Sequence, residues 1–269
     1  MPKIFVASFN RASNGAISKL VDKLISEDMY TDDYEKSDYI LAVGDRKETF
    51  DFVLERYREN KKIIHLWAGE KSSFELHDDV YRHAITLMSD FQLCTNNKAK
   101  QRVKDLCKSV DKKYCVITIG NIMLDNLEVD EEIDITKEYG VKKGDYDLIL
   151  YNPVTRESEE NILKEIENIE KIRDFNYIWI EPNGDKYSDL LENMVTHYNL
   201  PRPEFLRLLK DCNRFITNSS CQYYEAHFLI KPDQIISIGK RNKDRESKVA
   251  DMSIKHASDN VIKFIREIL

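Results

Sequence analysis

The stretch "RFITNSSCQYYEAHFLI", residues 214–230, sets a short apolar run directly against an Asn-Ser-Ser turn and the start of a helical pattern. The run is rich in β-branched and aromatic side chains, which is typical of a strand buried on both faces. Small polar residues directly before a helical pattern are typical of a helix N-cap. A buried strand that turns at once into a helix is the repeating element of an α/β fold, so we expect the same arrangement elsewhere in the chain.

Eight further apolar runs have a similar composition, and most of them end at Gly, Asn or Pro. They cover residues 3–9, 38–44, 62–69, 90–95, 114–120, 146–154, 176–183 and 233–239. Helical patterns lie between most of the runs. In residues 96–110, for example, one helical face carries Ala99, Val103, Leu106, Cys107 and Val110. Alternating strands and helices predict parallel sheets, with the loops that follow the strands meeting at one edge, where α/β proteins bind ligands.

The composition limits the classes of function that the chain can have. Its 269 residues are enough for one large or two modest domains, and a net charge of −7 argues against non-specific binding to nucleic acid. No apolar stretch approaches the ~20 residues of a membrane span. Residues 1–10 resemble a first strand and lack a signal-peptide pattern, so we expect a cytoplasmic protein. The five cysteines form no C-x-x-C pair and are expected to be reduced thiols.

Two charged segments have structural interpretations. Residues 125–145 are acidic and weakly periodic, and we expect them to connect two α/β lobes. A basic cluster lies opposite the apolar face of the helix predicted over residues 96–110, and it consists of Lys98, Lys100, Arg102 and Lys104. Such a cluster is expected to be a solvated face and not a nucleic-acid site.

Polar residues recur where the predicted strands end. Gly44-Asp45-Arg46 follows one strand, and Asp78-Asp79 opens a helix where the macrodipole favours carboxylates. Other strand ends carry Gly120-Asn121, Asn152-Pro153, Pro182-Asn183 and the Asn-Ser-Ser turn at 218–220. One polar residue at a strand end is a turn, whereas a series of them predicts a ligand site along the edge of the sheet.

The Asn-Ser-Ser turn itself has two interpretations. Taken alone, it is most simply a helix N-cap. Backbone N–H groups at a helix start also bind anions, and Arg241 and Arg245 follow the next strand with guanidinium groups that suit phosphate oxygens. With Glu225 placed to accept hydrogen bonds from ribose hydroxyls, the whole set favours a ligand that carries a diphosphate.

These motifs, in this order, resemble the UDP-N-acetylglucosamine 2-epimerase family, and in particular its hydrolysing branch. The resemblance covers essentially the whole chain and is carried by "SFNRAS" (8–13), "GDR" (44–46), "HLWAGE" (65–70), "DDVYRHAIT" (78–86), "GN" (120–121), "NPVT" (152–155), "EPNGD" (181–185), "NSSCQYYEA" (218–226) and "IGKRNKDR" (238–245).

The resemblance implies an α/β fold of two Rossmann-like lobes, with the glycosyltransferase-B architecture. Residues 1–122 would form the N-terminal lobe, with helix 256–269 packing back on it, and residues 123–255 would form the nucleotide-binding lobe. Only residues 12–38 separate the first strand's loop from the strand before "GDR", so the N-terminal lobe is expected to be reduced. Family members are commonly dimeric, which makes a homodimer an expectation here.

The resemblance also implies a role for individual residues in C2 epimerisation of a UDP-sugar with elimination and hydrolysis of UDP. Asp45 and Asp78 would be the acid–base carboxylates, with Asp79 beside them and Arg82 positioning the site. The nucleotide would be held by Arg11, Ser219, Ser220, Glu225, Arg241 and Arg245. The sugar would lie near Asn152, Asn183 and Glu70. Neither a cofactor nor a metal is implied.

Two positions depart from the family pattern. Trp67 stands where the family has a glutamate, and Asn152 stands where it has a histidine before the proline. Neither side chain exchanges a proton at neutral pH, and loss of a positioned acid or base typically costs ~10²–10⁴-fold in rate. Three hypotheses therefore stay open: an active enzyme, a nucleotide-sugar-binding or regulatory protein, and a structural subunit that uses the fold for assembly.

The histidines do not favour another chemistry. His77 and His83 are six residues apart, which puts them on different faces of a helix and argues against a metal site with Asp78 and Asp79. His65 lies inside an apolar strand and is expected to be a hydrogen-bonded core histidine. A Ser or Cys nucleophile at 218–221 is not supported, since the helix would turn the nearby His227 away from the turn.

Overall fold

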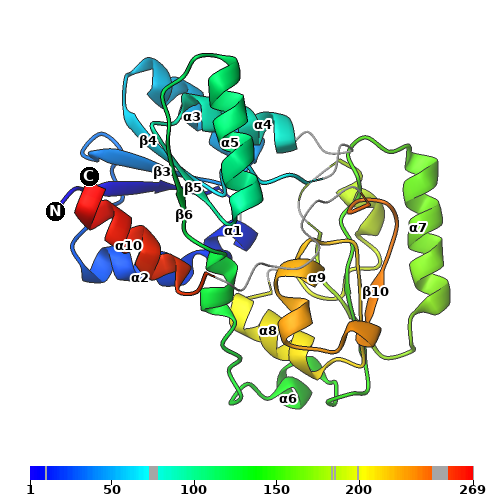
Figure 1. Cartoon of the computed structure of the whole chain (residues 1–269). Helices are drawn as coiled ribbons and strands as arrows, with labels where there is room; N and C mark the ends of the chain where they lie inside the picture. The colour runs from blue at the N-terminus through cyan, green and yellow to red at the C-terminus, as the bar shows by residue number, and fades with distance from the viewer. Residues whose placement is uncertain are drawn as a thin grey trace. The chain divides into compact units, whose positions relative to one another are not determined.

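The computed structural model describes residues 1–9, 11–72, 78–182, 184, 186–198, 200–243 and 254–268, without the side chains of Arg11, Ala12 and Ile268. It divides the chain into two compact units (Figure 1). The first unit contains the described residues up to Asn126 together with 254–268, and the second contains those from Leu127 to 243. Each unit has its own parallel sheet.

The first unit is built on a six-stranded parallel sheet in the order β2-β1-β3-β4-β5-β6. The strands are β1 (Ile4–Ala7), β2 (Tyr30–Thr31), β3 (Tyr39–Val43), β4 (Lys62–Leu66), β5 (Phe91–Cys94) and β6 (Cys115–Thr118). Residues of β3 alternate between the two faces: Leu41 and Val43 enter one core cluster, and Ile40 and Ala42 enter another. This sheet is therefore buried on both sides, which is why its strands are almost continuously apolar in sequence.

Helices cover both faces of this sheet. The helical segments are α1 (Arg11–Ala16), α2 (Ser18–Ser26), α3 (Lys47–Arg58), α4 (Asp78–Met88), α5 (Asn97–Ser109), α10 (Ala257–Ile268) and the 3₁₀ turn η1 (Ile122–Asn126). Helices α2 and α10 pack on one face through Leu20, Leu24 and Val261, among others. Helices α3 and α4 pack on the other face through Val53 and Ile85, so the unit is a three-layer α/β/α sandwich.

His65 ties β4 to α4 in the interior of the first unit. Its side chain is fully buried, with Nε2 2.8 Å from the Gly44 carbonyl oxygen and Nδ1 3.0 Å from the Thr86 hydroxyl. Because a carbonyl can only accept, Nε2 carries the proton and Nδ1 accepts. Burial lowers the pKa of His65 to about 4. The expectation of a hydrogen-bonded core histidine is therefore confirmed.

The helix α10 begins against the turn where the chain leaves the first unit. The carboxylate of Asp125 accepts from the backbone N–H groups of Ala257, at 3.2 Å, and of Ser258, at 2.6 Å. These are N–H groups of the first turn of a helix, which have no partner within the helix itself. A residue distant in sequence thus supplies the cap that a local N-cap side chain usually provides.

The second unit is built on a four-stranded parallel sheet in the order β10-β9-β7-β8. The strands are β7 (Asp147–Leu150), β8 (Tyr177–Trp179), β9 (Arg214–Thr217) and β10 (Ile235–Ser237). Its α-helices are α6 (Ile135–Tyr139), α7 (Glu159–Ile172), α8 (Arg202–Asp211) and α9 (Cys221–Tyr224), with 3₁₀ turns η2 (Ser188–Leu191), η3 (Ala226–Phe228) and η4 (Pro232–Gln234). Helix α7 packs on one face of the sheet, and α6, α8 and α9 pack on the other.

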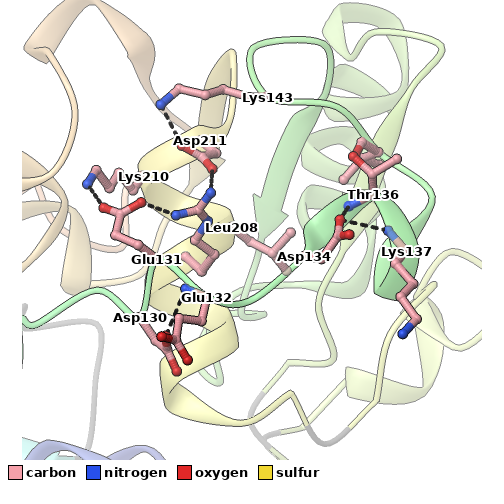
Figure 2. A network of polar contacts seen from close by, with 12 residues as sticks. Asp130, Glu131, Glu132, Asp134, Thr136, Lys137, Lys143, Leu208, Lys210 and Asp211 are labelled. Atoms are coloured by element: carbon pink, nitrogen blue, oxygen red, sulfur yellow. Dashed lines mark hydrogen bonds and ion pairs between the residues drawn. The ribbon is translucent and has the colours of Figure 1, made fainter.

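The acidic segment expected to be a connector is part of the second unit's structure. Figure 2 shows how it is fastened to α8: Glu131 pairs with Lys210 and Arg207, and Asp211 pairs with Arg207 at 3.0 Å and with Lys143 at 3.1 Å. Asp134 caps α6 by accepting from the backbone N–H groups of Thr136 and Lys137. Because the buried Asp211 carboxylate is compensated by two cations, this segment is held in a defined conformation.

The nine predicted strands are all present, and three details of the sequence interpretation are wrong. Strand β2 was not predicted, since two residues are too few to show a pattern. Val110, placed on the apolar face of its helix, is 55% exposed because α5 ends at Ser109. The helix expected after residues 218–220 is a single turn, α9, followed by η3.

All five cysteines are free thiols, as expected from the sequence, and four of them are buried.

None of the helices within the described ranges is both long enough and apolar enough to cross a lipid bilayer.

We predict that Asp125→Ala destabilises the protein by about 1 kcal/mol, because two N–H groups at the start of α10 lose their acceptor. Thermal unfolding should show a melting temperature lower by roughly 2–4 °C. Asp130→Ala is the control, since Asp130 accepts from Glu132 N–H in an exposed turn. Equal melting temperatures for the Asp125 variant and wild type would contradict the role of this cap.

A second prediction follows from the pKa of His65. The folded pKa, about 4, lies below the unfolded value of 6.5, so the unfolded state takes up the proton first. The stability that depends on a neutral His65 is therefore complete above about pH 6.5 and is lost as the pH falls towards 4, by on the order of 3 kcal/mol. Urea unfolding of His65→Gln should show lower stability at neutral pH and a shallower loss in acid. An unchanged acid slope would contradict the assignment.

Candidate functional site

Both sheets have a topological switch point at the carboxyl ends of their strands. In the first unit, β1 pairs with β2 on one side and with β3 on the other. In the second unit, β7 pairs with β8 on one side and with β9 on the other. Open α/β sheets bind ligands where successive connections leave a strand in opposite directions. The loops after β1 and β3, and those after β7 and β9, are therefore where functional residues are expected.

The first unit gathers three of the four predicted catalytic residues at this edge. Arg82 on α4, only 6% exposed, forms ion pairs with Asp45, two residues after β3, and with Asp79, whose Oδ1 lies 4.0 Å from Arg82 Nε. Ser72 joins the group: its hydroxyl accepts from Arg82 Nη2 at 3.2 Å, and its N–H donates to Asp79 at 2.8 Å. The guanidinium thus holds two carboxylates at one place.

The two other acidic candidates of this unit are Asp78, which lies beside the group around Arg82, and Glu70, which lies apart from it. Asp78 is the first residue of α4, next to Asp79, and is half-buried. Glu70, predicted to lie near the sugar, accepts from Thr95 Oγ1 and from Asn96 Nδ2 at 3.1 Å. Its carboxylate is therefore directed towards the end of β5.

Trp67 occupies the turn between β4 and the loop that carries Ser72. Its φ of 66° is in the left-handed region, which is strained for a bulky residue. Its ring lies against the end of the neighbouring strand β3, since a Cβ placed on Gly44 would be 3.5 Å from Trp67 Cε3. Backbone strain of this kind is concentrated at functional sites. Where the family pattern has a carboxylate, this protein has an indole that packs against the core of the first unit.

The second unit has a hydrogen-bonded network at the ends of β7, β9 and β10. Asn218 directly follows β9, and its side-chain amide makes two 2.7 Å hydrogen bonds to the backbone N–H and carbonyl of Asn152. Arg241 donates from Nη1 to the carbonyls of Asn152, at 3.3 Å, and Pro153, at 3.0 Å. Asn242 donates to the Asn218 carbonyl at 2.6 Å. Three strand ends are thereby joined by side-chain amides and one guanidinium.

The serines and glutamate of the turn have distinct surroundings. Ser220 is the N-cap of α9 and makes no side-chain capping bond within the described residues, whereas the Ser219 hydroxyl accepts from the Cys221 N–H at 3.4 Å. Ser219 donates its N–H to Thr217 Oγ1 at 2.9 Å. Glu225, 5% exposed, pairs with Arg202 at 2.5 Å. Burial raises the pKa of Glu225, and the guanidinium of Arg202 opposes this shift.

Some predicted residues lie outside the described part of the chain. These are Asn183, Arg245 and His77, together with the side chain of Arg11. His83 is described, and its Nδ1 is buried with no hydrogen-bond partner among the described residues; burial lowers its pKa to about 4. Among the residues that the structure describes, no three or more His, Cys, Asp and Glu side chains are arranged to hold a metal ion.

Sequence inspection missed four residues of these networks. They are Ser72, Arg202, Asn218 as a backbone clamp, and Asn242. Ser72 and Arg202 reach their partners across loops that carry no periodic signal. Asn218 was noticed only as a candidate cap, because a cap and a clamp use the same residue type. The signal available for Asn218 in the sequence was a polar residue that directly follows an apolar run.

The chain matches one family model, curated proteins and solved structures. The family model for UDP-N-acetylglucosamine 2-epimerase matches residues 5–269. A Legionella pneumophila protein named UDP-N,N'-diacetylbacillosamine 2-epimerase (hydrolyzing) is 25% identical over 87% of this chain and 65% of its own length. Polysialic acid biosynthesis protein P7 of Escherichia coli is 26% identical over 77% of this chain and 56% of its own length. The chain thus spans less than two thirds of the curated relatives it matches.

Solved structures confirm the predicted fold class of two Rossmann-like, glycosyltransferase-B-like lobes. The S. aureus MnaA–UDP complex matches with a TM-score of 0.63 at 17% identity, over 99% of this chain and 88% of that one. The UDP-N-acetylglucosamine 2-epimerase of Methanocaldococcus jannaschii in complex with UDP-GlcNAc and UDP matches with a TM-score of 0.60 at 15% identity, over 94% and 79%. With the family model spanning almost every residue, the chain belongs to the UDP-N-acetylglucosamine 2-epimerase family.

Proposed function

We propose that the protein acts on a UDP-2-acetamido sugar such as UDP-N-acetylglucosamine, inverting C2 while UDP is eliminated and replaced by water. Its family and its hydrolysing Legionella relative support this reaction. The observation that carries the proposal is the group of Asp45, Asp79 and Arg82 at the switch-point edge of the first sheet. Paired carboxylates around a buried guanidinium provide the proton-transfer groups that this chemistry needs.

The reaction is balanced as an elimination followed by addition of water. A carboxylate of the Asp45–Asp79 pair, or the adjacent Asp78, removes the C2 proton. The C2–H electrons form a C1–C2 double bond, and the C1–O bond breaks with its electron pair going to the UDP oxygen. A proton then adds to C2 on the opposite face, and water supplies hydroxide to C1. The products are the C2-inverted free sugar and UDP.

In this proposal, residues of the second unit hold the leaving nucleotide. Arg241 is fixed on the two carbonyls after β7 and would neutralise charge on the departing diphosphate, with Ser219 and Ser220 as hydrogen-bond donors. Glu225 would accept from the ribose hydroxyls, with Arg202 keeping its carboxylate in place. Arg11, Arg245 and Asn183 retain their predicted roles in phosphate and substrate binding, as does Asn152 near the sugar.

A second candidate function is nucleotide-sugar binding without turnover. Trp67 favours it, because an indole stands where the family pattern has a glutamate and cannot exchange a proton. The two candidates share a ligand and differ in product. A homodimer, expected from the family, and a cytoplasmic location, expected from the lack of a signal-peptide pattern, remain part of the proposal.

We predict that wild-type protein in D₂O releases UDP from UDP-N-acetylglucosamine and incorporates deuterium at C2 of the product, as followed by NMR. Asp45→Asn should slow both by ~10²–10⁴-fold, since the amide cannot take the proton. The control is Asp22→Asn, on the exposed side of α2. The substrate named for the Legionella relative, UDP-N,N'-diacetylbacillosamine, is the second substrate to test. Nucleotide binding with no product from either would favour the binding protein.

We predict that UDP raises the melting temperature, because a ligand at 100 times its Kd stabilises the folded state by about 2.7 kcal/mol. Arg241→Ala should abolish the shift by removing the guanidinium at the end of β7, whereas Arg241→Lys should keep part of it. Lys243→Ala, which removes an exposed cation two residues away, should leave the shift intact. An unchanged shift in Arg241→Ala would place the diphosphate elsewhere.

A further inference from the structure

The ends of β7 and β9 are joined by a side chain where the strand ladder stops. The two strands pair in register as far as Leu150 and Thr217. One residue later, the Asn218 amide takes over: Oδ1 accepts from Asn152 N–H at 2.7 Å, and Nδ2 donates to the Asn152 carbonyl at 2.7 Å. Asn218 is 0% exposed and Asn152 is 3% exposed. The side chain thus satisfies both polar groups of a buried residue that the sheet no longer reaches.

This arrangement requires an amide. The backbone of Asn152 presents one donor and one acceptor, and asparagine is the short side chain that offers a matching acceptor and donor in one plane. An aspartate has nearly the same shape, but its ionised carboxylate only accepts. It would leave the Asn152 carbonyl facing a negative charge in a buried place, which is unfavourable unless the carboxylate takes up a proton.

The same amide determines the position of the residues proposed to hold the diphosphate. The Asn152 carbonyl that accepts from Asn218 also accepts from Arg241 Nη1, at 3.3 Å. The Asn218 carbonyl accepts from Asn242, the residue next to Arg241, at 2.6 Å. Along the chain, Asn218 is followed directly by Ser219 and Ser220. The guanidinium and the serine turn are therefore both fixed relative to one side chain.

We propose that Asn218 is a positioning residue for nucleotide diphosphate binding, acting through its hydrogen bonds to the Asn152 backbone and its lack of charge. This inference rests on the proposed function, in that the bound anion is the diphosphate of UDP. Asn218 does not itself contact the ligand. Its amide holds Arg241 and the serine turn in the binding geometry. Because the amide is neutral, no negative charge at position 218 repels the diphosphate that Ser219, the next residue, would bind.

The test is the variant Asn218→Asp, measured at two pH values. Near pH 8 the carboxylate is ionised, cannot donate to the Asn152 carbonyl and repels the diphosphate, so calorimetric titration should show UDP affinity at least about tenfold below wild type. Near pH 5 the buried acid takes up a proton, and its O–H replaces the amide donor. The ratio of variant to wild-type affinity should then return towards one. Taking this ratio at each pH removes the effect of the titration of UDP itself.

The control is Asn176→Asp, which makes the same chemical change at an exposed position at the amino end of the same sheet and should give a ratio near one at both pH values. Melting temperatures without ligand separate positioning from mere stability. A variant that regains stability in acid while its UDP affinity stays at the wild-type level throughout would overturn the proposal. So would a loss of affinity that is the same at both pH values.

Should Asn218→Asp fail to fold near pH 8, Asn242→Leu tests the same network, since it removes the donor to the Asn218 carbonyl at nearly constant shape. A loss of UDP affinity of several-fold is expected, and wild-type affinity would overturn the proposal. Failure of the proposed function has a different signature: wild-type protein would then bind no UDP at either pH, and the role of Asn218 would fall with it.

Discussion

The buried residue at the end of β7 must have its N–H and carbonyl satisfied, and the rest of the second unit's edge depends on how this is done. The Asn218 amide supplies both partners, and the carbonyl it binds is shared with Arg241. The same requirement arises at the carboxyl ends of parallel strands in general. There the hydrogen bonds between strands have stopped and those of the following helix have not begun, so backbone N–H and carbonyl groups lack partners. Here side chains extend the ladder, and the same side chains place cationic and hydroxyl groups where an anion can be bound.

The first unit meets the corresponding requirement with a different set of groups. His65 joins the Gly44 carbonyl, just before Asp45, to the Thr86 hydroxyl on α4, the helix that also carries Arg82. One buried imidazole thus ties the strand end before Asp45 to the helix that provides its ion-pair partner. Since the charged form of His65 is disfavoured by burial, this connection is made by a neutral ring at neutral pH. In both units, neutral hydrogen-bonding groups support the charged ones.

The strands and the α/β class could be predicted because burial on both faces leaves a clear apolar signal, as in residues 39–43. The candidate residues could be predicted from strand-end motifs and from resemblance, and the structure brings Asp45, Asp79 and Arg82 together. Contacts between loops could not be predicted, since nothing in "NSS" distinguishes a cap from a clamp on a residue 66 positions away. The ion pairs that hold the acidic segment 125–145 could not be predicted, because they are made with cations on α8, which are distant in sequence.

Helix α10 has a consequence for how the chain is made. Its residues Val261, Ile262, Phe264 and Ile265 are buried in the same core cluster as Ile4 of β1 and Leu20 of α2. During synthesis the first sheet emerges early, yet one of its faces lacks that cover until residue 265 has left the ribosome. The second unit, whose described residues end at 243, can bury its core sooner. During translation the second unit can therefore complete its core before the first. Until α10 is made, the sheet of the first unit exposes apolar surface.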